Sequence, residues 1–351
     1  MPKKDSPNIS DKVEPFNKFQ LCAIQLMYND LKFLYTILNN QNIVTESYFV
    51  ALLPYLGVII DGVEDWINAY NNSSKYYKLN IQVFSSTEKD FYEKMRESIK
   101  LLECDFENLY NKIKCHYEDS VKYFSSKCHP IAKSLELYDI YGVLTCDGIP
   151  CDNTILDQCY FPYFSFDSLD KDEDIKKMTV IAGKYIGCFN VKDSYRVDSS
   201  MLFDTKDYGG FNRLNFGNEY NDKFLLFIIL CQVNFLLYSV DKFFVEEFST
   251  KLRFGYILYY YLCDFITELN KKIRADLFID RKYYSQLFRD TMAHYKFGIS
   301  INNEEEIISN DYMLGLTQKY FKEDYYSVKS FVYAQLESLS KQISKLLNFC
   351  N

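Results

Sequence analysis

Apolar residues recur every three or four positions along most of this chain, which is the spacing of one buried face of an α-helix. In the first third, this spacing predicts a helix that begins near Pro15 and ends at Asn39, and a helical region over residues 45–70 that Pro54 interrupts. The longest apolar seam covers residues 91–124 and predicts one long amphipathic helix. This seam can pack against the two helices before it or join two copies of the chain.

The pattern changes between residues 135 and 217. Turn signals occur there at Asp147-Gly148 and Gly209-Gly210, and short apolar runs cover residues 178–182 and 185–191. These features predict irregular structure with a few short strands. Helical spacing then returns, and we expect helices over residues 221–247, 250–273, 281–297 and 324–348.

These patterns predict a mainly α protein in three parts. Residues 1–134 are expected to form an N-terminal helical region, residues 135–217 a mixed and irregular segment, and residues 218–351 a C-terminal helical bundle. Hydrophobic residues make up 48% of the chain and charged residues 25%, which are ordinary globular values and exclude intrinsic disorder as the main state.

One apolar segment, residues 224–240, has to be distinguished from a membrane span. It has only 17 residues and holds Gln232 and Asn234 near its middle. A span needs about 20 apolar residues and amides are costly in lipid, so we expect a buried helix and no membrane contact. Residues 1–20 lack the apolar stretch of a secretory signal, and the 11 cysteines are odd in number. We therefore expect reduced thiols and a cytoplasmic protein.

Cysteine and histidine gather between residues 115 and 159, where zinc binding has to be considered. The segment contains five cysteines and two histidines, but the short ligand pairs of zinc sites are missing, apart from Cys146 and Cys151. Scattered reduced thiols and a zinc site both remain open, and no metal or other cofactor is assigned. The residues concerned are Cys115, His116, Cys128, His129, Cys146, Cys151 and Cys159.

The net charge of −8 excludes a protein that coats nucleic acid by bulk electrostatics, but it leaves room for a small basic site. The segment from Lys271 to Lys296 holds seven basic residues against three acids. Within it, Asp290 and His294 lie one helical turn apart and Arg289 is next to them. Gln286 and Lys282, four and eight residues before Asp290, continue the same polar stripe. The residues expected on the apolar face are Tyr284, Leu287, Phe288, Thr291 and Tyr295.

An arginine and a histidine on one helical face suit phosphodiester chemistry. Arginine binds phosphate through two nitrogens and neutralises charge that grows in the transition state. Histidine gives or takes a proton near neutral pH, and Asp290 can orient the imidazole of His294. No metal is required when a neighbouring ribose 2′-hydroxyl is the nucleophile.

The segment Arg289-Asp290-Thr291-Met292-Ala293-His294 resembles the R-[N/D/H]-x3-H signature of the HEPN superfamily (higher eukaryotes and prokaryotes nucleotide-binding). The resemblance covers about residues 218–351, and residues 1–217 resemble no family. It implies a small all-α bundle. It also implies a metal-independent ribonuclease of the kind found in toxin–antitoxin modules, phage defence and CRISPR effectors. Arg289 and His294 would then be catalytic and Asp290 accessory, and the neighbouring residues expected to bind RNA are Arg281, Lys282, Gln286 and Lys296.

The resemblance gives two functional hypotheses. In the first, the chain is an endoribonuclease that cleaves RNA by 2′-hydroxyl attack as a toxin or phage-defence effector. In the second, it is an inactive HEPN-like protein that binds RNA or nucleotide or serves as a scaffold. Because one chain supplies one Arg-x4-His motif, we expect a homodimer that places two motifs face to face, and an antitoxin or another defence protein as a further partner.

Overall fold

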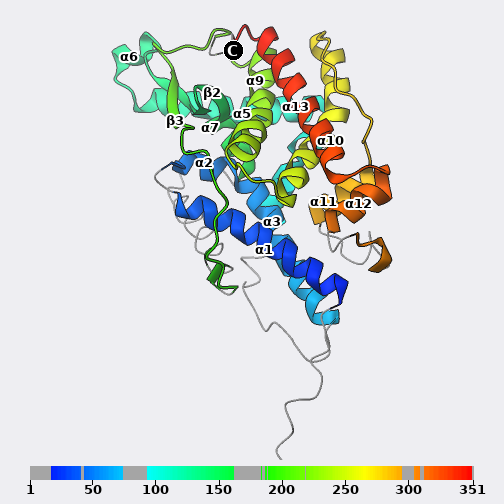
Figure 1. Ribbon diagram of the computed structural model, residues 1–351. Helices are drawn as coiled ribbons and strands as arrows, with labels where there is room; N and C mark the ends of the chain where they lie inside the picture. Colours follow the sequence, from blue (N-terminus) through cyan, green and yellow to red (C-terminus); the bar gives the residue numbers. More distant parts are fainter. Residues whose placement is uncertain are drawn as a thin grey trace, which may run out of the picture.

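The computed structural model describes residues 17–40, 43–73, 93–161, 183, 186–187, 189–217, 219–294, 304–308 and 312–349. The prediction of a mainly α protein is confirmed, with 67% helix and 9% strand among the residues that the structure describes. The buried apolar side chains form one continuous cluster that draws on every major helix and on the sheet. Figure 1 shows the arrangement of these helices and strands.

The N-terminal helices follow the predicted boundaries. Helix α1 (Lys18–Asn39) begins with a capping box, in which the Asn17 side chain accepts the Gln20 amide hydrogen and the Gln20 side chain accepts that of Asn17. Helices α2 (Glu46–Ala51) and α3 (Leu53–Ser73) are separated at Leu52, and Pro54 is the second residue of α3. Proline is well tolerated in a first helical turn, so the expected interruption becomes the start of a new helix.

The prediction of one long helix over residues 91–124 is wrong. Residues 93–97 are helical, a 3-10 helix η1 (Ser98–Glu103) follows, Cys104 is extended, and α5 (Phe106–Lys127) then begins anew. Asp105 caps α5 by accepting the Asn108 amide hydrogen at 2.9 Å, a local bond that competes with helix continuation. The first two residues of the seam, 91 and 92, lie outside the described residues.

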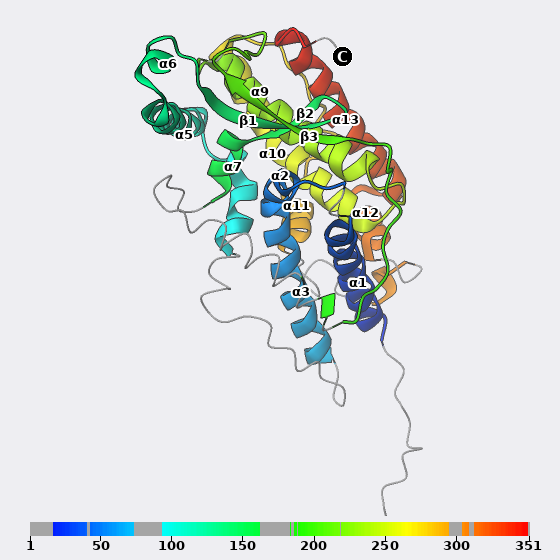
Figure 2. The ribbon, with the colours of Figure 1, turned by 90° about the vertical axis from the view of Figure 1, so that its left-hand side faces the viewer.

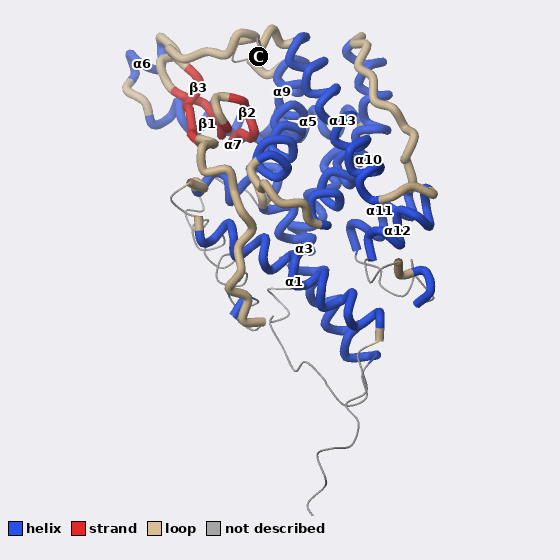
Figure 3. The backbone as a smooth tube through the Cα atoms, in the orientation of Figure 1, coloured by secondary structure: helices blue, strands red, loops and turns tan. Residues whose placement is uncertain are grey.

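A three-stranded antiparallel sheet follows the short helix α6 (Pro130–Ser134). Its strands are β1 (Asp139–Cys146), β2 (Ile149–Asn153) and β3 (Phe203–Gly209), in the order β2-β1-β3. The expected turn at Asp147-Gly148 joins β1 to β2, with φ angles of 50° and 80° that suit a tight hairpin. Figure 3 shows the three strands together at one end of the molecule.

Two apolar runs of the middle segment do not supply strands. Residues 178–182 lie outside the described residues, and of residues 185–191 the described ones are helical at 186–187 and otherwise turn or coil. A short helix, α7 (Thr154–Tyr160), instead follows β2 and is capped by Asn153. Short apolar runs do not distinguish strand from helix, and here they also fit loops that pack on a core.

The C-terminal part is helical, as predicted. It contains α9 (Asp222–Asn234) with a π-helical continuation η2 (Phe235–Lys242), α10 (Ser249–Ile273), α11 (Gln286–His294), a 3-10 turn η3 (Glu304–Glu306), α12 (Tyr312–Phe321) and α13 (Tyr325–Leu346). Helix α12 was not predicted, because Gly315 in its middle lowers helix propensity. In Figure 2, the sheet lies beside α9, and α1 and α3 extend toward the opposite end.

Residues 222–242 form the one stretch of the described chain that is long and apolar enough to cross a membrane, and 83% of its most apolar window is buried within the protein. Its polar Asn234 is satisfied inside the fold, since the amide nitrogen donates to the Pro150 carbonyl at 2.8 Å and the side-chain oxygen accepts from Ser340 at 2.6 Å. This is the environment of a core helix in a soluble protein, as the sequence predicts.

Candidate functional site

Helix α11 carries the Arg-x4-His motif, and its orientation differs from the expected one. Phe288 is fully buried and packs edge-on against Tyr256, with ring centroids 4.5 Å apart. Leu287, expected on the apolar face, is 66% exposed, whereas Arg289, expected on the open polar stripe, is only 6% exposed. The prediction of an exposed Arg289 is therefore wrong. His294 is the last residue of α11, and its side chain lies outside what the structure describes.

The Arg289 guanidinium is held between aromatic rings and carboxylates. Its Nη1 donates to the Tyr261 hydroxyl at 3.2 Å and lies 3.3 Å from Asp290 Oδ1, while Nη2 lies 3.8 Å from Glu103 Oε1. The ring centroids of Tyr260 and Tyr261 are 5.0 and 5.3 Å from the guanidinium carbon. Its Nε is buried and has no hydrogen-bond partner among the described residues. These contacts, all with side chains of the same chain, compensate the positive charge of Arg289.

A pocket of about 280 Å³ adjoins Arg289, since three of the residues that contact Arg289 also line it. Two of those three are tyrosines, and both are buried, with the Tyr260 ring stacked on that of Tyr284 at 4.5 Å between centroids. The rest of the lining is strongly acidic, and a phosphate entering the pocket would meet these carboxylates. The residues that line it are Leu102, Glu103, Cys104, Asp105, Tyr260, Tyr261, Asp264, Phe265 and Glu268.

Three of the four expected RNA-binding residues lie on the surface. Arg281 is exposed and donates to Asp264 Oδ1 at 2.8 Å, and Lys282 is exposed with its Nζ 2.7 Å from the Tyr283 hydroxyl. Gln286 is exposed at the first position of α11. Lys296 lies outside the described residues.

The basic character of residues 271–296 is offset in the folded chain. Lys272 pairs with Glu107 at 2.8 Å, Lys282 lies 3.5 Å from Glu323, and Arg281 and Arg289 contact acids as described. These acids come from η1, α5, α10 and the loop before α13, all distant in the sequence. Counting charges within one segment therefore overestimates the positive potential of the site.

Of the described cysteines and histidines of residues 115–159, Cys146 and Cys151 lie against each other, but the set does not converge on one point. Cys115 is exposed, whereas Cys146, Cys151 and Cys159 are buried, and His129 caps α6 by accepting the Ile131 amide hydrogen at 3.3 Å. Burial lowers the pKa of His116 to about 4, with Lys112 adding to the effect. Among the described residues, no group of three or more His, Cys, Asp or Glu side chains is arranged to hold a metal ion.

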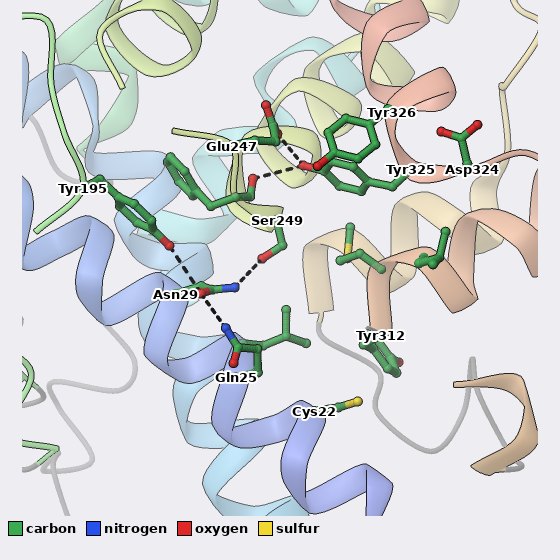
Figure 4. Close-up of a pocket in the computed structure, with 14 residues that line it drawn as sticks. Cys22, Gln25, Asn29, Tyr195, Glu247, Ser249, Tyr312, Asp324, Tyr325 and Tyr326 are labelled. Atoms are coloured by element: carbon green, nitrogen blue, oxygen red, sulfur yellow. Dashed lines mark hydrogen bonds between the residues drawn. The ribbon is translucent and has the colours of Figure 1, made fainter. Parts of the chain in front are cut away.

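A larger cavity, of about 770 Å³, lies on another part of the molecule (Figure 4). Sequence analysis missed it, because its walls come from α1, the junction of η2 and α10, α12 and the start of α13. No spacing within one segment reveals such a site. No protein-family model, no curated protein and no solved structure matches this chain.

Proposed function

We propose that the chain is a cytoplasmic, metal-independent endoribonuclease of HEPN type, centred on Arg289 and His294. The observation that carries this proposal is the position of Arg289, whose guanidinium lies against Tyr260 and Tyr261 beside an open pocket. An arginine that can bind phosphate beside a pocket is what a site for an RNA backbone needs, and the two buried tyrosines fix the position of that arginine.

The proposed chemistry uses two side chains of the motif. Attack by the ribose 2′-oxygen on phosphorus forms the 2′,3′-cyclic phosphate and breaks the bond to the 5′-oxygen. His294 takes the proton of the 2′-hydroxyl, while the leaving 5′-oxygen gains a proton from water or from the second motif of a dimer. Arg289 neutralises the charge that develops on the phosphoryl oxygens.

The arrangement described here is a closed state of that site. Glu103 and Asp290 contact the guanidinium of Arg289, which an RNA phosphate would have to reach. The Glu103 contact is long, at 3.8 Å, and its side chain is about half exposed, so it is the weaker of the two carboxylate contacts. Displacement of Glu103 by a phosphate would open the site from the pocket side.

We predict cleavage of single-stranded RNA in EDTA, with 2′,3′-cyclic phosphate ends. A matched oligonucleotide with a 2′-deoxy nucleotide at the cut position should stay intact, because the nucleophile is missing. Arg289→Ala should lower the cleavage rate by about 10²–10³. Cleavage that requires magnesium, or that proceeds on the deoxy substrate, would refute this mechanism.

Glu103→Gln should raise the affinity for RNA and the cleavage rate, because it removes the charge that competes with phosphate for Arg289. Glu118→Gln on α5 is the matched control: it removes the same charge from an exposed side chain paired with Lys114, and should change neither quantity. Equal effects of the two variants would show that RNA affinity and cleavage depend only on the net charge of the protein, and that Glu103 does not compete with RNA for Arg289.

The burial of Arg289 favours a second candidate function, an inactive HEPN-like binding or scaffold protein. Here Arg289 fixes α11 to α10 and η1 through Tyr261, Asp290 and Glu103. In that case Arg289→Ala lowers the free energy of unfolding, and the wild-type protein cleaves no RNA. Thermal unfolding of the variant, measured beside the ribonuclease assay, separates the two functions.

We also propose that the active form is a homodimer, with an antitoxin or another defence protein as a possible further partner. One chain supplies a single Arg-x4-His motif, whereas cleavage needs a proton acceptor and a proton donor. The apolar seam is not available for dimerisation, because Leu109, Ile113 and Tyr117 are buried within the chain. Light scattering at micromolar concentration should give about twice the chain mass, and a fully active monomer would contradict this prediction.

A further inference from the structure

The 770 Å³ cavity has the size of a site for a small organic molecule. One wall is a chain of neutral hydrogen-bonding groups. Gln25 donates to Asn29 Oδ1 at 3.1 Å, the Tyr195 hydroxyl donates to the same oxygen at 3.3 Å, and Asn29 Nδ2 lies 3.4 Å from Ser249 Oγ. Figure 4 shows these side chains together on the α1 side of the cavity.

The opposite side of the cavity is aromatic and apolar. Tyr312 and Met313 of α12 lie there, and Leu26 of α1 completes the apolar surface. Tyr325 is buried, whereas Tyr326 is 66% exposed and stands edge-on to it with ring centroids 5.3 Å apart. Tyr326 therefore presents a ring face at the rim that no described aromatic side chain covers fully.

The charged residues that line the cavity are both acidic. They are Glu247 and Asp324, and none of the described lining residues is Lys, Arg or His. Glu247 accepts from the Tyr325 hydroxyl at 2.7 Å and pairs with Lys329 at 3.0 Å, so its charge is largely compensated. Asp324 is exposed, and its bonds from the Ser327 side chain and amide lower its pKa, so it is ionised at neutral pH.

The N-terminal ends of α10 and α13 also face this cavity, and helix N-termini attract anions. In this protein, the chain's own carboxylates stand at those ends. Asp324 caps α13 by accepting the Ser327 amide hydrogen at 2.9 Å, and Glu247 directly precedes Phe248, the N-cap of α10. The positive end of α13 is thus compensated by its own cap, whereas α10 has no side-chain cap, and the rim of the cavity is acidic and aromatic.

We propose that this cavity binds a small organic cation with an aromatic or apolar body. The ammonium group would lie at the rim between Asp324 and the exposed ring of Tyr326, where a carboxylate and an aromatic face both attract it. The body would lie along Leu26, Tyr312 and Met313. This site goes beyond the proposed ribonuclease function and does not depend on it, because it shares no residue with the Arg289 pocket.

The test uses three probes of matched size, 2-phenylethylammonium, 2-phenylethanol and phenylacetate, with the full-length chain. Isothermal titration calorimetry and the ligand-induced shift of the unfolding temperature are read together. We expect the cation to bind most tightly, the alcohol more weakly and the anion weakest. No RNA is present, so the outcome is independent of ribonuclease activity.

Asp324→Asn is the decisive variant, because asparagine caps a helix as well as aspartate does but carries no charge. It should weaken binding of 2-phenylethylammonium about two- to fivefold and leave 2-phenylethanol unchanged. Glu323→Gln is the control: it removes a neighbouring charge that pairs with Lys282 and does not line the cavity. That variant should bind all three probes as the wild type does.

Several results would overturn the proposal. Tightest binding of phenylacetate would show that the helix ends dominate, and equal binding of all three probes would show that charge is not recognised. Loss of affinity in Glu323→Gln equal to that in Asp324→Asn would indicate a long-range charge effect only. No binding of any probe at millimolar concentration would show that the cavity is not a site for this class of ligand.

Discussion

Asp30→Ala should lower the free energy of unfolding by about 3–5 kcal/mol, because it leaves a buried arginine without its counter-charge. Asp30 on α1 and Arg253 on α10 are 1% and 2% exposed. Arg253 Nη1 lies 3.1 and 3.0 Å from the two Asp30 oxygens, and Thr250 donates to Oδ1 at 2.7 Å. This pair joins the N-terminal helices to the C-terminal bundle at its centre.

The ion pair itself contributes little net stability, as the pKa values indicate. Burial raises the pKa of Asp30 and lowers that of Arg253 to about 10, and in each case the partner's opposite charge counteracts burial. The Asp30 carboxylate and the Arg253 guanidinium are thus both costly to bury in the charged form, and each stays charged only because the other is present. The double variant Asp30→Leu with Arg253→Met should therefore recover most of the stability lost in Asp30→Ala.

Denaturant unfolding of the two single variants and the double variant measures the coupling. As a control, Glu337→Ala removes an exposed partner of Lys341 and should change the free energy of unfolding by less than about 1 kcal/mol. A loss in Asp30→Ala no larger than in that control would show that water reaches Arg253. The Arg253 side chain also approaches the Met292 carbonyl at 3.5 Å, so Arg253 variants should affect α11 as well.

Most helix boundaries of this fold are predictable from sequence, because local chemistry sets them. The capping residue Asn17, the proline at position 54 and the turn at Asp147-Gly148 all act within a few residues. The error at Asp105 is of the same local kind, since an apolar seam continues across a position where a side-chain cap starts a new helix. Periodicity reports the buried face but not where the hydrogen-bond ladder is interrupted.

The candidate site was less predictable, because its partners are distant in the sequence. Arg289 has a polar end group, so it was expected on the exposed face together with Lys282 and Gln286. Its burial depends on Glu103 from η1 and on Tyr261 from α10, which no pattern within α11 indicates. A long arginine stem buries well when distant groups satisfy its nitrogens.

A second buried polar pair should make stability fall as the pH rises. Asp152, at 3% exposure near the end of β2, lies beside the half-buried Asp157 in the first turn of α7, and each carboxyl group shifts the pKa of the other. Asp152 Oδ2 and Asp157 Oδ1 are both buried without a donor among the described residues. Two acceptor oxygens can bond only if one carries a proton, so the pair shares one.

The pKa values give the direction of the effect. Burial raises the pKa of Asp152 to about 7. The hydrogen bonds with the Asp157 side chain and the Asn153 amide act in the opposite direction and lower it. Burial, together with the charge and hydrogen bond of Asp152, raises the pKa of Asp157 well above its ordinary value. No basic side chain of the described residues contributes to either shift, although the uncharged Tyr160 and Cys231 also face the pair.

A carboxyl group whose pKa is raised by folding contributes its full stability below the unfolded pKa of about 4, and that contribution is lost as the pH rises through the folded pKa. For Asp152 the loss occurs between about pH 4 and pH 7 and amounts to something on the order of 4 kcal/mol. Asp157 extends the loss to higher pH. The free energy of unfolding, measured by denaturant titration, should therefore decrease across this range.

Asp157→Asn tests the shared proton directly. The asparagine amide can donate to Asp152 at every pH, and only one carboxyl group remains, so the decrease between pH 5 and pH 8 should become clearly smaller. Asp139→Asn, at the exposed start of β1, removes one carboxylate without touching the pair and should keep the wild-type slope. A wild-type protein that grows more stable over this range, or equal slopes in the two variants, would show that Asp152 is ionised and solvated. A reduced slope in Asp157→Asn alone places the shared proton between β2 and α7.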